Sequence, residues 1–360
     1  MGTPVAAFLM KNRQILKYHS IAGLVVGAFL FLMGLSGAVL VFQHDIEDLQ
    51  WEKYKSVSSA EDLNIDLGIN TIQENYPGWD TRLIHFKAKE SLVFNLRKPT
   101  ERLFVFIHPS SGEIIKEVNE LTTFTRWLLK FHYSFQAGPA GRILVFFVGL
   151  LFLFSILSGL YLYRKSFFKT LFFKMRIVSK NKRTFYSSLH RIVGVWSLIL
   201  NLLLVVTGVF LAWTVAAAGL KPPSTPETPI VTTSVEELLN KINIQNQDFT
   251  PTYIRLPLSP GGDLRVYGLY DDDAFFFSEF YNSFLANYET GEITGKIRVQ
   301  EADLKTQLSS TLIPLHFGQY GGIWSKILYC LTGLSGPFLS ISGFIIWKKR
   351  NDKRRYIHKA

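Results

Sequence analysis

Residues 17–42 read KYHSIAGLVVGAFLFLMGLSGAVLVF, a histidine followed by an apolar run that closes on a Ser-Gly step. From Ile21 to Phe42 this run has no charged residue, and a helix rising about 1.5 Å per residue would carry it across a bilayer core. Three further runs share these properties: Ile143–Tyr163, Ile192–Leu220 and Ile327–Trp347. The sequence therefore predicts a membrane protein with four transmembrane α-helices. We expect the first run to be an uncleaved anchor, because no signal-peptide cleavage pattern follows it.

The charges predict the orientation in the membrane. Segments 1–17, 164–183 and 348–360 hold 18 of the 39 Lys and Arg residues but only one of the 28 acidic residues, Asp352. The positive-inside rule places these segments and both termini in the cytoplasm of a bacterial inner-membrane protein, with the two long connections in the periplasm. The net charge of +11 is then a topology signal and a contact for lipid headgroups, and we expect no nucleic-acid partner.

The chain also repeats itself. The start of the first run, KYHSIAGL at 17–24, matches SLHRIVGV at 188–195. The first and third helices end on Ser36-Gly37 and Thr207-Gly208, and the second and fourth end on Ser158-Gly159 and Ser342-Gly343. Each copy of the repeat crosses the membrane twice, so both copies have the same orientation. They are therefore parallel repeats about a pseudo-two-fold axis along the membrane normal.

Each repeat carries an inserted segment of similar pattern. Both open on a capping-box-like helix start, at 59–62 and 234–237. Both continue with alternating strand-like runs, at 92–96 and 264–268, and close on a hairpin turn before a strand, at 109–114 and 288–293. The pattern predicts two small extracytoplasmic α+β domains.

We therefore expect eight segments. They are 1–42 (cytoplasmic N-terminus and first span), 43–125 (first inserted domain), 126–163 (second span), 164–187 (basic loop), 188–220 (third span), 221–313 (second inserted domain), 314–347 (fourth span) and 348–360 (basic tail).

Four of the eight histidines follow the repeat, since His19 matches His190 and His132 matches His316. His19 and His190 begin outward-running helices and should lie near the cytoplasmic face. His132 and His316 precede inward-running helices and should lie near the outer face. Partners of equal depth therefore come from different repeats, and the predicted pairs are His19/His190 and His132/His316.

Two facing imidazoles suit the axial positions of haem iron, so the pairs predict two haem b groups per chain. Zinc fits less well, because no Cys or carboxylate lies beside these histidines. The competing interpretation is that each histidine is an ordinary interfacial residue. His44 is a reserve outer ligand, while His85, His108 and His358 are expected to have no site role. Cys330 is interpreted as a small helix residue and Asp271-Asp272-Asp273 as a solvated loop rather than a cation site.

Other chemistry is thin. The sequence has no P-loop, no Gly-x-Gly-x-x-Gly after a strand and no His-Glu-x-x-His motif. The cytoplasmic segments are too short to fold a flavin or nicotinamide domain, so a cytoplasmic protein or a membrane quinol would have to donate electrons. Because the two sites are separated by most of a bilayer, an aromatic residue such as Trp196, Trp213 or Trp324 is a candidate relay.

Several motifs resemble one family. The Leu-His-x-x-x-Gly start at 189–194, the Leu-His-Phe-Gly step at 315–318 with Gly-Gly-x-Trp-Ser-Lys at 321–326, and the Gly-x-x-x-Trp-Lys-Lys exit at 343–349 resemble the PepSY-associated transmembrane family. The Ser-Gly-Glu-Ile and Thr-Gly-Glu-Ile turns are similar to those of divergent PepSY domains. The first repeat departs from the family pattern, since Lys17-Tyr18-His19-Ser20 stands where Leu-His-Arg is usual.

The resemblance implies an iron-regulated inner-membrane protein and, as in some members, a di-haem reductase of ferric siderophores. It would carry haem ligation onto His19, His132, His190 and His316. On this hypothesis electrons cross the membrane to a ferric siderophore held by the periplasmic domains. The alternative is a non-enzymatic, membrane-anchored PepSY protein with a binding or regulatory role. A siderophore permease ranks last, because the spans are poor in polar residues.

Overall fold

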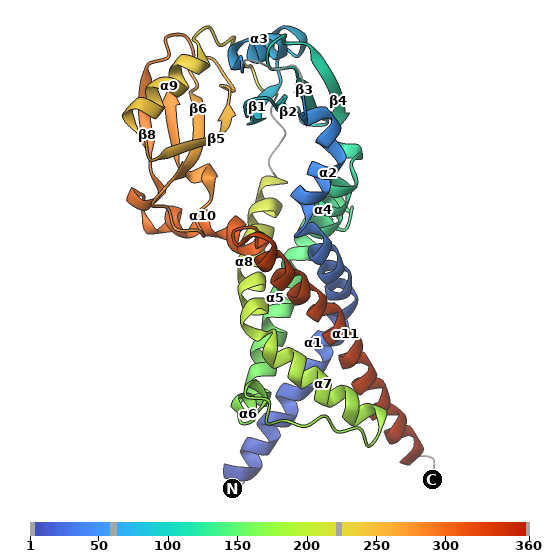
Figure 1. Cartoon of the computed structure of the whole chain (residues 1–360). Helices are drawn as coiled ribbons and strands as arrows, with labels where there is room; N and C mark the ends of the chain where they lie inside the picture. The colour runs from blue at the N-terminus through green and yellow to red at the C-terminus, as the bar shows by residue number, and fades with distance from the viewer. Residues whose placement is uncertain (1–3, 58–62, 221–224, 358–360) are drawn as a thin grey trace. The chain divides into compact units, whose positions relative to one another are not determined.

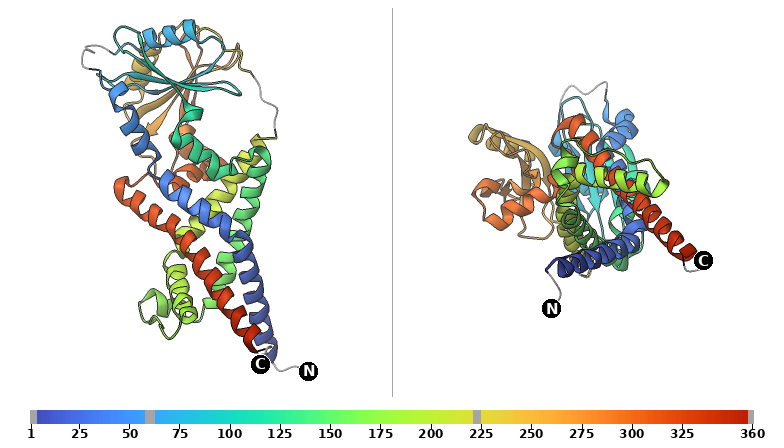
Figure 2. Two further views of the ribbon diagram at one scale, coloured as in Figure 1. Left: turned by 90° about the vertical axis from the view of Figure 1, so that its right-hand side faces the viewer. Right: turned by 90° about the horizontal axis from the view of Figure 1, so that it is seen from below.

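The computed structural model of the chain describes residues 4–57, 63–220 and 225–357. They divide into two compact units. The first unit contains residues 1–42, 128–220 and 315–360, and the second contains 43–127 and 221–314. Figures 1 and 2 show the helices of the first unit as a long bundle and the strands gathered in the second.

The regular elements in the described part of the first unit are all helices. Its elements are α1 (Pro4–Leu40), the end of α4 (Phe124–Ser134), α5 (Gly138–Tyr163), α6 (Phe167–Leu171), α7 (Lys182–Trp196), α8 (Leu198–Ala218), the end of α10 (Leu304–Phe317) and α11 (Gly322–Ile357). Among the described residues, four stretches are long and apolar enough to cross a membrane: Asn12–Leu40, Gly138–Tyr163, Leu198–Ala218 and Gly322–Asp352. The predicted membrane protein with four apolar helices is therefore confirmed.

The third predicted helix, 188–220, is not continuous. It is divided at Ser197 into α7 and α8, and Ser197 Oγ donates to Val193 O at 2.7 Å. A serine that bonds back to its own helix competes with the regular backbone ladder and often bends a helix. No Gly or Pro marks this position, which explains why the sequence did not predict the break.

Close packing of α1 against α11 depends on small residues. A Cβ added at Gly34 would lie 2.6 Å from Gly333 O and 2.4 Å from Pro337 Cδ. The two backbones therefore approach as closely as they do in membrane helix pairs with small residues at the interface. α1 also packs along α5, α5 along α8, and α7 along α11.

The second unit contains one eight-stranded antiparallel sheet in the order β4-β3-β2-β1-β5-β6-β7-β8. Its strands are β1 (Asp80–His85), β2 (Leu92–Arg97), β3 (Arg102–Ile107), β4 (Ile114–Asn119), β5 (Phe249–Arg255), β6 (Leu264–Tyr270), β7 (Ser283–Ala286) and β8 (Ile293–Ile297). The other elements are the helices α2 (Gln43–Lys55), α3 (Ile65–Asn75) and α9 (Val235–Gln245), the 3-10 turns η1 (Glu120–Thr122), η2 (Glu279–Tyr281) and η3 (Val299–Glu301), and the first residues of α4 and most of α10.

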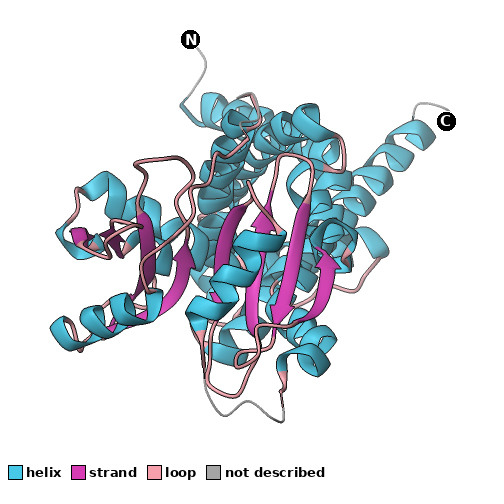
Figure 3. Cartoon of the chain, turned by 90° about the horizontal axis from the view of Figure 1, so that it is seen from above, coloured by secondary structure: helices cyan, strands magenta, loops and turns pink. Residues whose placement is uncertain are grey.

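The two inserted segments were expected to fold as separate domains, and this was wrong. β1 of the first segment pairs with β5 of the second, with Leu83 opposite Ile254, and one apolar core runs under both halves. Helices cover one face of the sheet, as the view from above shows (Figure 3). Each half would otherwise leave an edge strand unpaired, and joining the edges removes that exposed backbone.

The helices of the two halves cap one another. Asp66 on α3 accepts from Ser234 Oγ at 2.5 Å and from Val235 N at 2.6 Å, at the start of α9. In return Glu236 accepts from the backbone N–H of Ile65, at the start of α3. A carboxylate at a helix start satisfies unpaired N–H groups and faces the positive end of the dipole.

The local predictions within these segments had mixed outcomes. Ser234 is the N-cap of α9, with its Oγ accepting from Glu237 N at 3.1 Å. The predicted strands 92–96 and 264–268 are the first residues of β2 and β6, and the two hairpin turns contain Gly112 and Gly291 at φ 72° and 67°. The predicted helix start at 59–62 lies outside the described residues, and α3 begins later, with Asn64 as its N-cap.

Candidate functional site

The four repeated histidines all lie in the first unit. His19 is on α1 and His190 on α7, and both line one cavity. His132 is on α4 and His316 on α10, with ring centres 6.4 Å apart. The structure thus brings together the same partners that the repeat predicted. We call His19 and His190 the cavity pair, and His132 and His316 the facing pair.

Each histidine has a hydroxyl partner on a neighbouring helix. The hydroxyl oxygen lies within hydrogen-bond distance of imidazole Nδ1 in all four cases. The pairs are His19 with Ser158 at 3.0 Å, His190 with Ser342 at 2.8 Å, His132 with Ser36 at 2.9 Å and His316 with Thr207 at 3.1 Å. One arrangement is therefore built four times from different parts of the chain.

These hydroxyl groups also determine where the imidazole proton lies. Each of them donates to a backbone carbonyl of its own helix, as Ser158 Oγ does to Phe154 O at 2.7 Å and Thr207 Oγ1 to Leu203 O at 2.8 Å. A hydroxyl has a single proton, so its oxygen is left to accept from the imidazole Nδ1–H. In this tautomer Nε2 keeps a free lone pair.

A glycine follows every one of the four hydroxyl residues, and it lies against the ring. A Cβ at this glycine would come within 3.6 Å of the imidazole Cε1 or closer in each case: Gly159 (3.3 Å), Gly343 (3.6 Å), Gly37 (3.1 Å) and Gly208 (2.8 Å). The Ser/Thr residue thus holds one ring atom, and the missing side chain of the next residue leaves room for the ring. Together they fix the direction in which Nε2 points.

The facing pair has the spacing that a shared metal ion requires. An ion held at about 2.0 Å by one nitrogen of each ring, with that nitrogen about 1.2 Å from the ring centre, would separate the centres by about 6.4 Å. The observed separation is 6.4 Å, with the rings tilted by 55°. Within the described residues no group of three or more His, Cys, Asp or Glu side chains could hold a metal. Two imidazoles at the separation of the facing pair fit the two axial positions of a haem iron.

The cavity between α1, α5, α7 and α11 has a volume of about 520 Å³. Glycines line it at three places where a side chain would fill it. A Cβ at Gly23 would meet nothing within 4 Å, one at Gly194 would meet only Leu339 at 3.8 Å, and one at Gly336 only a carbonyl at 3.7 Å. Because Gly23 and Gly194 each follow a cavity-pair histidine by one helical turn, the open space begins directly beside the two rings.

Three arginines line the same cavity: Arg183, Arg191 and Arg350. Arg191 donates to Ser187 O at 2.9 Å and lies over the Tyr163 ring, whereas Arg350 Nε is buried and makes no hydrogen bond among the described residues. A cavity with two lone-pair nitrogens, glycine walls and cationic residues is complementary to a flat apolar ring with carboxylate substituents. The residues present therefore fit haem.

The remaining candidate residues have other surroundings. His44 is on α2 in the second unit, 63% exposed, with Glu47 at 3.7 Å, and the facing pair forms without it. His85 Nε2 lies 2.5 Å from Glu90, and His108 Nδ1 accepts from the backbone of Ser111 at 3.2 Å. His358 lies outside the described residues.

The acidic loop has structural partners. Asp272 forms an ion pair with Arg298 at 2.5 Å, and Asp273 accepts from Tyr270 N at 2.8 Å and from Asn282 at 2.6 Å. The candidate relay residues Trp196, Trp213 and Trp324 are 47%, 58% and 79% exposed. All three side chains are therefore exposed at the surface of the first unit.

The roles of the Ser/Thr-Gly steps were not predicted from the sequence. Ser36-Gly37, Thr207-Gly208, Ser158-Gly159 and Ser342-Gly343 stand out as repeated helix ends, but their partners become visible only in the fold. The spacing carries a signal. Ser36 and Thr207 each follow a cavity-pair histidine by 17 residues, and Ser158 and Ser342 each follow a facing-pair histidine by 26. Equal spacing of polar residues in both repeats would have identified them.

Comparison with protein families identifies the family of this chain. No curated protein matches the chain. Residues 16–350 match the sequence profile described as the PepSY-associated TM region, which includes all four paired histidines and their hydroxyl partners. Since the match covers nearly the whole chain, the protein belongs to the PepSY-associated transmembrane family.

Proposed function

We propose that this protein carries electrons across a bacterial inner membrane through two bis-histidine haem b groups and reduces a ferric siderophore on the periplasmic side. The cavity pair would hold one haem and the facing pair the other. The proposal rests above all on the four hydroxyl–imidazole bonds, because they direct the proton to Nδ1 and leave Nε2 ready to bind iron.

The cavity pair and the facing pair are linked through α1, which carries His19 and also Ser36, the hydroxyl partner of His132. On α1, His19 and the residue that holds His132, Ser36, are 17 residues apart, a rise of about 26 Å. This interval nearly equals the thickness of a bilayer core. Two flat macrocycles extending from these positions would shorten the remaining gap, which is why no aromatic relay is required.

Bound haem would supply a one-electron couple at each site. The chain's own contribution is to hold four imidazoles in a single tautomer, to exclude water with apolar helices, and to match carboxylate substituents with Arg183, Arg191 and Arg350. Ser/Thr acceptors raise the electron density of the ligating ring and so influence the reduction potential.

The electron balance is simple. One electron converts ferric to ferrous iron, and siderophores bind the ferrous ion far more weakly, so the metal is released. A membrane quinol would give two electrons and two protons and serve two ferric ions, while a cytoplasmic redox protein would give one electron at a time. In this arrangement both termini lie in the cytoplasm, with the sheet unit in the periplasm.

The test is the visible spectrum of protein purified in detergent after expression with adequate haem. We expect a Soret band and two haems per chain. His19→Ala or His190→Ala should remove one haem, His132→Ala or His316→Ala the other, and each should abolish reduction of ferric siderophore by reconstituted vesicles. His85→Ala is the matched control, because it alters a histidine outside both pairs.

The alternative function, a non-enzymatic binding or regulatory protein, makes the opposite prediction. Wild-type protein without a Soret band, or a variant lacking all four paired histidines that retains its cellular function, would reject the electron-transfer proposal and favour the alternative.

A further inference from the structure

The sheet of the second unit has a second face that differs from its apolar core face. Leu83, Phe94 and Ile254 point into the core, so the alternate residues of the same strands point the other way. The cross-strand pairs on this opposite face include Arg82 with Arg255, and Arg97 with Arg102. Arginines from four adjacent or neighbouring strands are thus gathered at its centre.

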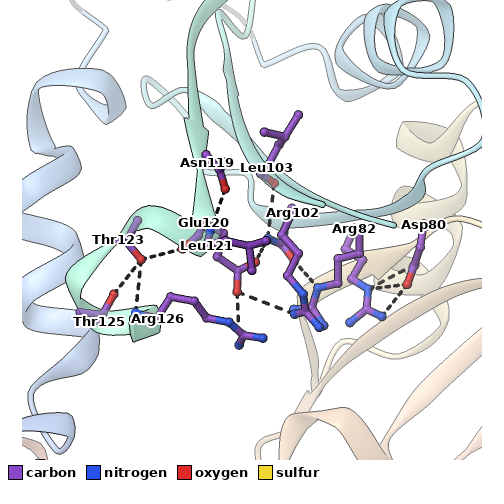
Figure 4. A network of polar contacts seen from close by, with 12 residues as sticks. Asp80, Arg82, Arg102, Leu103, Asn119, Glu120, Leu121, Thr123, Thr125 and Arg126 are labelled. Atoms are coloured by element: carbon purple, nitrogen blue, oxygen red, sulfur yellow. Dashed lines mark hydrogen bonds and ion pairs between the residues drawn. The ribbon is translucent and has the colours of Figure 1, made fainter. Parts of the chain in front are cut away.

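This group, which we call the arginine face, has an excess of positive charge. It contains Arg82, Arg97, Arg102, Arg255 and the nearby Arg126, against two carboxylates, Asp80 and Glu120, for a formal charge of +3. Figure 4 shows how the carboxylates are used: Asp80 is bound by Arg82, and Glu120 lies between Arg102 and Arg126. The acidic groups are therefore already engaged.

Arg97 has no acidic partner of its own. Its Nε donates to Asn95 Oδ1 at 2.5 Å, and among the described residues it forms no ion pair. Burial, together with the charges of Arg82 and Arg102, lowers the pKa of Arg97 to about 10, and the opposing attraction of Glu120 is smaller than these effects. Directly opposed like charges in a sheet are destabilising. An arginine held here against that repulsion, with Arg126 Nε also buried and without a hydrogen bond, indicates a place for an anion.

The surroundings leave this place only partly covered. α2 packs Trp51 over Phe104 and Phe106 toward one end of the face. On the other side Tyr253 and Tyr267 form an aromatic wall with ring centres 5.5 Å apart. Between them the side chains of Arg82 and Arg255 remain 18% and 29% exposed. Guanidinium groups are thus presented within apolar and aromatic borders, which strengthens their attraction for a fitted anion.

We propose that the arginine face binds the ferric chelate of a polycarboxylate ligand of the α-hydroxycarboxylate type. Planar guanidinium groups bind carboxylates in bidentate pairs, and several carboxylates on one chelate would match several arginines. This inference rests on the proposed function, for which it names the substrate class. Such chelates hold ferric iron less tightly than catecholates do, which suits release by one-electron reduction.

The experiment measures binding without any redox step. Full-length protein in nanodiscs is titrated with gallium(III) citrate, whose metal is not reducible under these conditions, and with the uncharged gallium(III) complex of a trihydroxamate. We expect citrate chelate to bind at least tenfold more tightly than the hydroxamate chelate. Arg97→Gln should weaken it about tenfold or more, which corresponds to at least about 1.4 kcal/mol. Arg97→Lys should restore part of the lost affinity, because lysine keeps the positive charge but lacks the paired N–H donors of the planar guanidinium group.

Arg298→Gln is the matched control, since Arg298 pairs with Asp272 at a distant part of the same sheet unit. Equal binding of both chelates, or an Arg97→Gln effect no larger than that of Arg298→Gln, would overturn the inference. So would metal-free citrate binding as tightly as the gallium complex, which would indicate a simple anion site. The haem spectrum is recorded on each sample. A sample that binds the gallium chelate but has no haem spectrum would contradict the electron-transfer proposal alone. A sample with haem that does not bind the chelate would contradict this inference alone.

Discussion

The hydroxyl groups beside the four histidines set the direction of each imidazole ring. Replacing Ser158 with Ala would remove the hydroxyl acceptor of the His19 Nδ1–H, at a cost of about 1–3 kcal/mol. We expect the haem at the cavity pair to bind roughly 10–100-fold more weakly. Haem titration of the apoprotein measures this change.

Ser155→Ala provides the control for this prediction. Ser155 lies on the same helix, and its hydroxyl donates to Leu151 O at 3.0 Å rather than bonding to a histidine. The substitution leaves the Ser155 backbone, which also bonds to His19, in place. An equal loss in both variants would mean that the helix, rather than the imidazole bond, had been disturbed.

The ion pairs of Asp80 predict that the second unit loses folding stability in acid. Burial acts to raise its pKa, but the hydrogen bonds and charges of Arg82 and Arg255 hold it below the usual value. A carboxyl group with a lowered folded-state pKa contributes stability that is complete above its unfolded pKa, about 3.9, and is lost as the pH falls through the folded value. Thermal unfolding measured as the pH is lowered from 6 to about 2 should show this loss, below the unfolded pKa of about 3.9. Asp80→Asn should unfold at a lower temperature at pH 6, with a weaker dependence on acid.

At the residue scale, the sequence predicted the histidine pairs because the repeat and the helix directions together determine depth. It did not identify Ser36, Thr207 or the glycines after them. A serine in a transmembrane helix has many uses, and only the fold shows which ring it contacts. Arg97 was also missed, because its significance depends on neighbours from other strands.

At the element scale, the glycines that line the cavity leave the space that a haem would fill. A leucine at Gly23 would meet no atom within 4 Å of its Cβ and would project into the open space. We therefore expect Gly23→Leu to fold normally but to hold one haem per chain instead of two. Ala28→Leu, at an exposed position of the same helix, should keep both. Pyridine haemochrome analysis gives the stoichiometry, and two haems in Gly23→Leu would show that the cavity is not the haem site.

The helix boundaries illustrate what an apolar run can and cannot predict. Length and composition were sufficient to locate four spans, because a membrane requires about 20 apolar residues. They gave no information about the division at Ser197, where hydrogen bonding rather than hydrophobicity changes. The fourth predicted span, by contrast, does continue through Pro337 as one helix, α11.

At the scale of the whole molecule, the second unit should unfold as one cooperative body. Leu83 and Ile254 are fully buried and opposed across the β1–β5 pairing that joins its halves. Leu83→Ala should cost about 2–5 kcal/mol and reduce hydrogen-exchange protection in β7 as well as in β2. Leu269→Ala, at a position 36% exposed on β6, should have a much smaller effect. Loss confined to β2 would indicate two independent halves.

The joining of these halves was beyond sequence reasoning for a physical reason. The alternating runs predicted strands correctly, and the turns at Gly112 and Gly291 predicted hairpins. However, β1 and β5 are more than 160 residues apart, and their two edges pair because a common core forms beneath both. Local sequence patterns do not indicate which distant strand will pair with a given edge strand.

The histidine of one site and the hydroxyl acceptor of the other site lie on the same run of helix. The number of residues between them therefore sets the distance between the two sites. Seventeen residues separate the ring of one site from the acceptor of the other on α1, and the same number separates His190 from Thr207 across α7 and α8. Inserting one residue in that interval would turn the far end by about 100° and displace it by about 1.5 Å, so that one bond would form only if the other were lost. Members of this family should therefore vary in length within the turns of the sheet, but keep this interval constant.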